Sequence, residues 1–356
     1  MQTTRQHFLL LDGLRGVAAI SVVWGHALVC TGRATPPGFE LAVDFFYILS
    51  GFVVAHAYQA RLATGMTWSS FARVRLIRLY PLMMLGALIG IGVAAFLLLR
   101  SADFAWWRLW ASAALSLIAL PSFLIPTSPL VFPMNSPSWS LSFEFVANFI
   151  YGALGPKLSQ RVLIALTGFG AVALVATALW FGALTVGYQK TTILGGFARV
   201  GFGFLCGLAI HGCARMPRLR PRIGLLIACL LAFILLAPIP QPLSLQLALV
   251  IVAFPMMVQA AASVDLGPRA SKISKLLGEA SYPLYILHFP ILQLITRAIE
   301  RIDPSGHVKG AFLIVEVVAC ILVSYGALTL FDKPIRRWLS KPATPPATTE
   351  ARVYAP

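Results

Sequence analysis

The chain has 356 residues, of which 58% are hydrophobic and 11% are charged, and its formal net charge is +16. A soluble domain carries roughly 25% charged residues, so the composition excludes a soluble fold and predicts a protein embedded in the lipid bilayer. The basic residues lie in short loops between apolar runs. Membrane topology explains that distribution, and no nucleic-acid partner is expected.

Ten apolar stretches are long enough to span a bilayer. They cover about residues 10–31, 38–58, 79–99, 139–155, 162–183, 195–212, 223–239, 243–262, 280–298 and 310–331. An eleventh stretch, residues 105–135, is interrupted by prolines and edged by tryptophans, which indicates a re-entrant or interfacial segment. We therefore predict an all-α, polytopic membrane helical bundle of about ten transmembrane helices.

Clusters of basic residues predict the orientation, because loops rich in Lys and Arg stay on the cytoplasmic side. An even number of crossings must separate consecutive clusters, and this holds only if residues 105–135 do not cross fully. Ten spans with both termini cytoplasmic follow. Residues 1–341 would form one membrane domain, and residues 342–356, rich in Pro, Thr and Ala, a disordered cytoplasmic tail. The clusters lie at residues 61–78, 157–161, 215–222, 269–275 and 333–341.

Arg15 and His26 lie in the first predicted span. Eleven helical steps of about 100° bring their side chains to one face, about 16 Å apart along the helix axis. Ionisable groups in hydrocarbon are expensive and mark a functional site by default. The alternative is an interfacial arginine that snorkels to the surface and a histidine that is satisfied within the core.

Further ionisable and polar groups enter other spans at a similar depth. Asp44 begins the second span, and Glu144 lies in the fourth with Ser140 one turn away. Tyr285 and His288 share one face of the ninth. Asp44 could instead pair with an arginine near the outer surface, and Ser140 could satisfy a backbone carbonyl. The five cysteines lack the spacing of metal ligands, and no metal is expected.

Arg75 and Arg78 precede the third span at the cytoplasmic side and share a helix face. Two guanidinium groups on one face can grip a phosphate through paired hydrogen bonds. Positive-inside topology explains the same two residues without a ligand. With Arg15 at the same depth, a site for a polyanion becomes an equal alternative.

Five segments in order resemble acyltransferase family 3, whose members include bacterial O-acetyltransferases of surface polysaccharides. The segments are LDGLRGVAAISVVWGH (residues 11–26), DFFYILSGF (44–52), RLIRLYP (75–81), PSWSLSFEF (137–145) and SYPLYILHFP (281–290). The resemblance extends to about residue 332. The positions that match the motifs of the family are Arg15 and His26, Arg75 and Arg78, and Trp139, Ser140 and Glu144.

The resemblance implies a bacterial inner-membrane enzyme that takes an acyl group, acetyl in the simplest case, from cytoplasmic acyl-CoA. Acyl-CoA would be a co-substrate, with no permanently bound cofactor. The acceptor would be a hydroxyl group of a surface polysaccharide, a lipid-linked glycan or a small molecule. Some members of the family carry an additional hydrolase-like domain outside the membrane; this sequence suggests a transferase without one.

In the mechanism that this resemblance suggests, arginines hold the CoA phosphates and His26 acts as general base on the acceptor hydroxyl. Glu144 or Asp44 would orient the imidazole or the acceptor. The expected CoA ligands are Arg15, Arg75 and Arg78, and the expected substrate-binding residues are Trp139, Ser140, Tyr285 and His288. A proton-coupled exporter or flippase is the alternative, because intramembrane histidines and carboxylates also form proton relays. The repeats typical of such transporters are not evident in the sequence.

Overall fold

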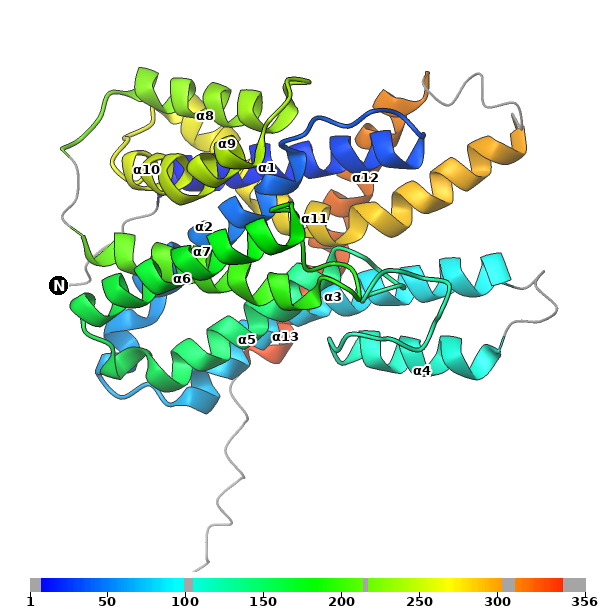
Figure 1. Ribbon diagram of the computed structural model, residues 1–356, viewed down its shortest axis with the longest axis horizontal. Coiled ribbons are helices and arrows are strands. Elements are labelled where there is room, and N and C mark those ends of the chain that lie inside the picture. The colour runs from blue at the N-terminus through cyan, green and yellow to red at the C-terminus, as the bar shows by residue number, and fades with distance from the viewer. Residues whose placement is uncertain (1–7, 99–104, 214–216, 303–310, 342–356) are drawn as a thin grey trace, which may run out of the picture.

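The computed structural model describes residues 8–98, 105–213, 217–302 and 311–341 (Figure 1). Within these residues the chain is helical, and its few β-type contacts are isolated bridges. The all-α fold is therefore confirmed. The α-helices are α1 (Leu9–Cys30), α2 (Ala42–Ala63), α3 (Trp68–Leu98), α4 (Trp106–Leu117), α5 (Ser138–Leu154), α6 (Gln160–Phe181), α7 (Ile193–Gly212), α8 (Pro221–Leu236), α9 (Leu243–Ala248), α10 (Phe254–Ala261), α11 (Pro268–Ile302), α12 (Leu313–Ala327) and α13 (Lys333–Leu339). Short 3₁₀ turns cover Phe39–Leu41 and Gly155–Lys157, and π-turns Leu249–Ala253 and Leu328–Asp332 continue α9 into α10 and α12 into α13.

Seven helical segments of the described residues are long and apolar enough to cross a membrane. Each of the ten predicted spans falls on a helix, but α5 and α8 have only 17 and 16 residues, and the 35-residue α11 is too polar to be counted. A polytopic bundle is thus confirmed, whereas the number ten is not. Helix α2 is central, since 72% of its spanning window is buried, and α6 is peripheral with 22%.

Residues 105–135 form an element that doubles back. The 12 residues of α4 extend about 18 Å, less than the roughly 30 Å of a hydrocarbon core, and α4 lies beside the second half of α3 (Figure 1). The following loop then enters the bundle, where Val131, Phe132, Met134 and Asn135 are buried. This folding back agrees with the re-entrant or interfacial segment that the prolines predict.

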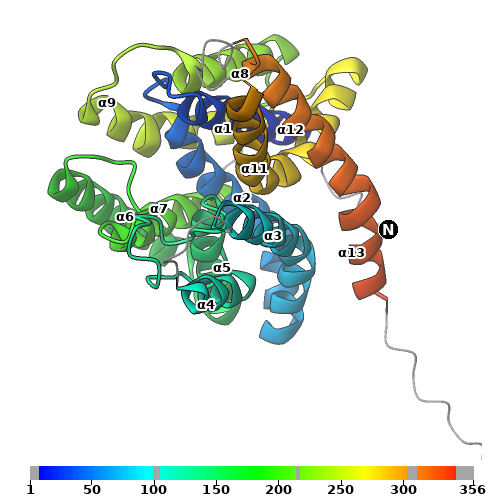
Figure 2. The same ribbon diagram turned by 90° about the vertical axis from the view of Figure 1, so that its right-hand side faces the viewer.

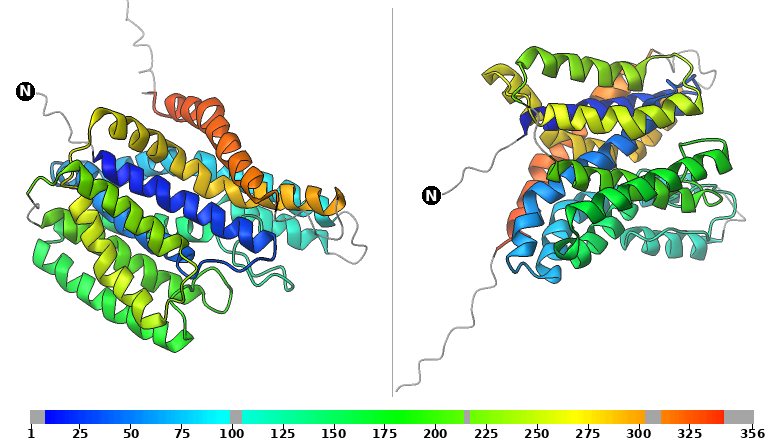
Figure 3. Two further views of the ribbon diagram at one scale, coloured as in Figure 1. Left: turned by 90° about the horizontal axis from the view of Figure 1, so that it is seen from above. Right: turned by 60° about the vertical axis from the view of Figure 1, so that its left-hand side comes forward.

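Helices α1 and α11 run side by side through the bundle (Figure 3). The seam is tight because Gly13 and Gly16 of α1 face Ser274 and Leu277 of α11, and a Cβ atom on Gly16 would overlap the Leu277 side chain. Small residues allow such close approach of helices in membranes. Because α11 begins at Pro268, well before the predicted start of its span, it accompanies α1 along its whole length.

The ends of α2, α5, α7 and α10, which border basic clusters, lie at one end of the bundle (Figure 1). Arg218 pairs with Asp265 across the loops that follow α7 and α10 at 3.2 Å, and Leu219 forms a bridge with Val264. This arrangement agrees with a shared side for those loops. Arg5, Arg100, Arg215, Lys309, Arg352 and the predicted tail 342–356 lie outside the described residues. Cytoplasmic placement of both termini therefore stays a prediction.

The re-entrant loop also supports α11. Pro290 has no N–H group, so the carbonyl of Ile286, four residues earlier, lacks its usual helical donor. Asn135, which is 1% exposed, fills that place: its Nδ2 donates to the Ile286 oxygen at 2.8 Å. A backbone carbonyl buried in a bilayer needs such a donor. Asn135 therefore joins the loop to the helix that carries Tyr285 and His288.

Replacing Asn135 by alanine should lower the free energy of unfolding by about 1–3 kcal/mol, because the Ile286 carbonyl then stays buried without a donor. Adding Pro290→Ala should recover part of that loss, since the new N–H at position 290 can donate to the same oxygen. Thermal unfolding in detergent measures both effects. Equal Tm values for the single Asn135→Ala variant and the double variant would show that Asn135 does not replace the missing donor.

Candidate active site

Two histidines meet on the seam between α1 and α11. His26 Nδ1 lies 3.2 Å from His288 Nε2 and 3.0 Å from the oxygen of Val22, and His288 Nδ1 lies 3.0 Å from the oxygen of Leu284. His288 is fully buried, whereas His26 is partly exposed. Sequence reasoning placed His26 and His288 at a similar depth but did not predict that they touch.

Two aromatic rings flank His26. Phe39 and Phe289 lie edge-on to its imidazole, with ring centroids 5.4 and 5.5 Å away. Phe39 belongs to the 3₁₀ turn before α2, and Phe289 follows His288 on α11. The imidazole is thus fixed between two apolar rings and one polar partner.

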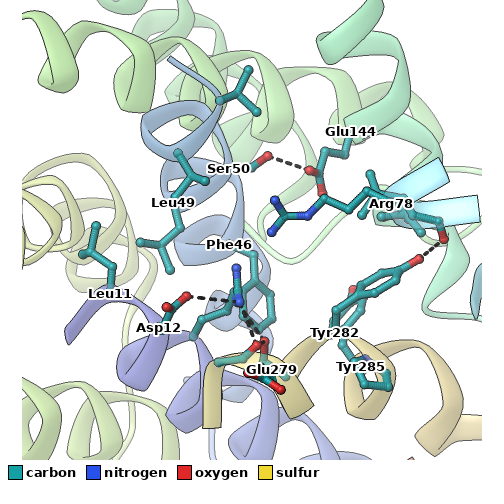
Figure 4. Close-up of a pocket in the computed structure, with 18 of the residues that line it drawn as sticks. Leu11, Asp12, Phe46, Leu49, Ser50, Arg78, Glu144, Glu279, Tyr282 and Tyr285 are labelled. Atoms are coloured by element: carbon teal, nitrogen blue, oxygen red, sulfur yellow. Dashed lines mark hydrogen bonds and ion pairs between the residues drawn. The ribbon is translucent and has the colours of Figure 1, made fainter. Parts of the chain in front are cut away.

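A cavity of about 450 Å³ opens between the helices on the side of Arg15 (Figure 4). Its wall contains six cationic and four acidic side chains, a formal charge of +2. The cationic residues are Arg15, Arg75, Arg78, Lys275, Lys333 and Arg336, and the acidic ones are Asp12, Glu144, Glu279 and Asp332. The three predicted CoA ligands therefore come together in one cavity, together with Glu144, Ser140 and Tyr285.

Arg15 is held by the opening turns of α11. Its Nε donates to Ser281 Oγ at 2.7 Å, and its Nη2 donates to the Gly278 oxygen at 2.7 Å and pairs with Asp12 at 3.2 Å. The close α1–α11 seam makes these contacts possible. Arg15 is thus a rigid part of the cavity wall, not a side chain that snorkels freely to the surface.

Arg75 and Glu144 form a second fixed pair. Arg75 Nη2 donates to Glu144 Oε1 at 3.0 Å, and Ser50 Oγ donates to the same oxygen at 2.5 Å. Figure 4 shows Ser50 and Glu144 joined at one wall of the cavity, with Asp12 and Glu279 on the opposite side. Glu144 therefore orients an arginine. Arg78, one turn further along α3, also lines the cavity.

Sequence reasoning did not predict that three further cations line the cavity. Lys275 lies on α11, and Lys333 and Arg336 lie on α13, which the π-turn Leu328–Asp332 continues directly from α12. Lys333 pairs with Glu279 at 2.7 Å and Arg336 with Asp332 at 2.8 Å. These residues belong to clusters that topology already explains, so the sequence carried no separate signal for a site.

Tyr285 closes the inner end of the cavity. Its hydroxyl lies 2.6 Å from Ser140 Oγ, which also donates to the Pro137 oxygen, and its ring contacts Phe46 with centroids 5.3 Å apart. On its other side the Tyr285 ring lies 6.2 Å from that of His288. His26 and His288 do not line the cavity. Tyr285 therefore lies between the arginine-rich cavity and the histidine pair, with Phe46 packed against its ring.

Asp44 and Trp139 belong to a different cluster. Arg199 on α7 donates to both carboxylate oxygens of Asp44, at 3.0 and 2.7 Å, and to the carbonyls of Val186 and Glu40. Its guanidinium carbon lies 5.3 Å from the Trp139 ring centre. Both charges are 1% exposed. The structure thus shows Asp44 paired with an arginine. Such a pairing near the outer surface was the alternative to a role in the reaction.

Known proteins resemble most of the chain. A family model described as "Acyltransferase domain" matches residues 8–331. A Rhizobium radiobacter protein named "Protein 2 in picA locus" is 34% identical, over 51% of this chain and 99% of its own length. The acyltransferase MdmB of Streptomyces mycarofaciens is 26% identical, over 88% and 86% of the two chains.

A longer relative matches nearly the whole chain. The peptidoglycan O-acetyltransferase OatA of Listeria monocytogenes is 24% identical over 94% of this chain, which spans 56% of that relative's length. No solved structure is significantly similar to the chain.

Replacing Arg199 by methionine should destabilise the protein by roughly 3–5 kcal/mol, because the Asp44 carboxylate would stay buried without its partner. The matched control is Arg218→Met, which breaks an ion pair whose arginine is 87% exposed and should leave Tm nearly unchanged. Thermal unfolding of both variants in detergent measures the difference. Similar Tm values for the two variants would contradict a structural role for the Asp44–Arg199 pair.

Proposed function

The chain belongs to the acyltransferase domain family, and from this premise we propose that it moves an acyl group from cytoplasmic acyl-CoA to an acceptor hydroxyl. That the chain is an acyl-transferring enzyme of the membrane follows from the family and from its apolar helices. The donor, the acceptor and the residue roles are our proposal. We place the protein in the bacterial inner membrane with both termini in the cytoplasm.

The observation that carries the proposal is the cationic cavity. Coenzyme A combines a multiply phosphorylated nucleotide with a long, narrow pantetheine arm. The lysines and arginines at the mouth and Arg78 suit the phosphates, and the apolar inner walls near Leu49 and Phe46 suit the arm. A formal charge of +2 in a confined site attracts a polyanion more strongly than the same charges in water would.

Arg15 has a defined part in this scheme. Its Nε and Nη2 are engaged with α11 and Asp12. Its guanidinium is therefore presented in one orientation, with Nη1 for a phosphate or for the polar pantetheine arm. Arg75, held by Glu144, contributes positive charge to the same wall. In this proposal Glu144 and Asp44 position arginines, while His26 alone acts as base.

The reaction requires the thioester to reach His26. The arm would extend past Phe46 and Tyr285, whose rings must move apart to admit the acyl group. His26 then accepts the proton of the acceptor hydroxyl as its oxygen forms a bond to the carbonyl carbon. The bond between that carbon and the sulfur of CoA breaks, and the departing thiolate accepts from His26 the proton that the acceptor hydroxyl gave up. Acyl ester and free CoA thiol are the products.

The acceptor would approach His26 from its exposed side, between Phe39 and Phe289. Flat aromatic rings at this opening suit a sugar or another partly apolar hydroxyl compound. The name of the Listeria relative supports a glycan. A surface polysaccharide, a lipid-linked glycan or a small hydroxyl compound would each fit this chemistry.

His26→Gln should lower the rate of acyl transfer at least about 100-fold, because glutamine cannot act as general base. Mass spectrometry of surface glycans and secreted small molecules, from cells with and without the protein, identifies the acceptor by its lost acyl mass. Radiolabelled acetyl-CoA then measures transfer to that acceptor by protein in lipid nanodiscs. His56→Gln is the control, since His56 lies against Phe8 and His211, away from the seam. Near-normal transfer by well-expressed His26→Gln would refute the proposed base.

Replacing Arg78 by glutamine should raise KM for acetyl-CoA about 10-fold or more and change kcat much less, because a charge-assisted hydrogen bond to phosphate is lost. The effect should shrink at high salt, which screens charge at the cavity mouth. Arg218→Gln, at the same end of the bundle but outside the cavity, is the matched control. An unchanged KM in Arg78→Gln would argue against this cavity as the CoA site.

A further inference from the structure

We propose that His288 is a positioning residue that fixes the tautomer of His26, so that Nε2 of His26 is the nitrogen that accepts the acceptor's proton. This inference rests on the proposed function, in which His26 is the base. It assigns to a second histidine the part that a carboxylate plays in a Ser-His-Asp triad.

The tautomer of His288 follows from its helix. His288 Nδ1 lies 3.0 Å from the carbonyl oxygen of Leu284, and a carbonyl oxygen can only accept. Nδ1 must therefore carry a hydrogen. His288 is fully buried, and a charged ring would be costly there. In the neutral ring Nε2 is then a bare acceptor.

The tautomer of His26 follows in turn. Its Nδ1 faces two acceptors, the Val22 oxygen at 3.0 Å and His288 Nε2 at 3.2 Å. If Nδ1 carried no hydrogen, its lone pair would face the lone pairs of both acceptors, which repel it. Nδ1 must therefore hold the hydrogen, and His26 Nε2 is left with the free lone pair that a general base needs.

His288 also restrains the imidazole ring. The two rings lie with centroids 5.0 Å apart and their planes at 44°. His288 itself is fixed, because Cys320 Sγ lies 3.9 Å from its backbone oxygen and Asn135 holds Ile286 two residues earlier. When His26 accepts a proton, the Nδ1–H bond to His288 Nε2 becomes charge-assisted and strengthens.

A histidine partner suits this place in the membrane better than a carboxylate. An ionised carboxylate at this depth would need its own cation, as Asp44 needs Arg199 and Glu144 needs Arg75. A neutral imidazole supplies the acceptor atom without that requirement. The two carboxylates predicted to orient His26 are engaged elsewhere, and His288 occupies the position beside it.

Substitutions at His288 separate this role from simple packing. Glutamine carries its Oε1 the same number of bonds from Cα as the Nε2 of histidine, so His288→Gln keeps an acceptor facing His26. The oxygen of asparagine lies as many bonds from Cα as the Nδ1 of histidine, one bond fewer than Nε2. His288→Asn therefore keeps an amide group that is too short to reach His26. We expect kcat within about 10-fold of wild type for glutamine and a loss of about 100-fold or more for asparagine and for His288→Phe, because triad enzymes lose up to about 10⁴-fold with the wrong tautomer. KM for acetyl-CoA should stay near the wild-type value in all three variants.

A spectroscopic measurement decides the tautomer without reference to activity. Protein labelled with ¹⁵N-histidine in nanodiscs should show a protonated, pyrrole-type Nδ1 and a bare, pyridine-type Nε2 for His26, assigned by the signals that disappear in His26→Gln. In His288→Phe only the Val22 oxygen still faces Nδ1, and with one of the two acceptors lost these signals should shift toward a mixture of tautomers. A protonated Nε2 in wild type, or asparagine and phenylalanine variants as active as the glutamine variant, would overturn the role of His288. An active His26→Gln enzyme would instead refute the proposed base, and the nitrogen signals would still decide the tautomer.

Discussion

The close seam between α1 and α11 is the constraint on which the proposed site depends. Gly13 and Gly16 let the two helices approach so closely that Arg15 reaches Ser281 and Gly278 at one level and His26 reaches His288 at another. Either contact would be lost if the helices stood apart by the width of one larger side chain. The same close packing thus places both Arg15, the proposed donor-binding cation, and His26, the proposed base, against α11.

The bilayer explains how the remaining charges are arranged. In the described part of the core, two buried ion pairs connect different helices: Asp44 with Arg199, and Arg75 with Glu144. The fully buried Glu316 accepts a hydrogen bond from Thr296 instead. The attraction within each ion pair offsets the free energy of moving its charges from water into hydrocarbon. The pairs also join α2 to α7 and α3 to α5. In the cavity wall, Lys333 pairs with Glu279 at 2.7 Å, and both side chains are about one-third exposed. The pair of Arg336 with the buried Asp332 lies in the same wall.

Hydropathy and helix geometry predicted the features that are determined by a single segment of the chain. The all-α bundle, the doubled-back segment 105–135 and the shared face of Arg15 and His26 all follow from local patterns. Partners across helices did not follow, because the sequence contains no measure of rotation or depth between helices far apart in the chain. Asp44 and Glu144 therefore looked like companions of His26, although each is held by an arginine. That Lys333 and Arg336 line the cavity was not predicted for another reason. The positive-inside rule already explains basic residues at these positions, so their presence in the sequence does not point to a site.

The hydrogen bond from Asn135 to Ile286 determines the stage of folding at which the proposed site can form. Individual apolar helices can insert into a membrane one after another, but α11 carries a proline at position 290 and a carbonyl at Ile286 that its own helix cannot satisfy. That carbonyl is satisfied only after the loop from α4 has folded back between α3 and α11. The histidine pair, two residues further along α11, is consequently a product of the assembled bundle. A partly assembled chain in the membrane would hold the same side chains without the contact between His26 and His288.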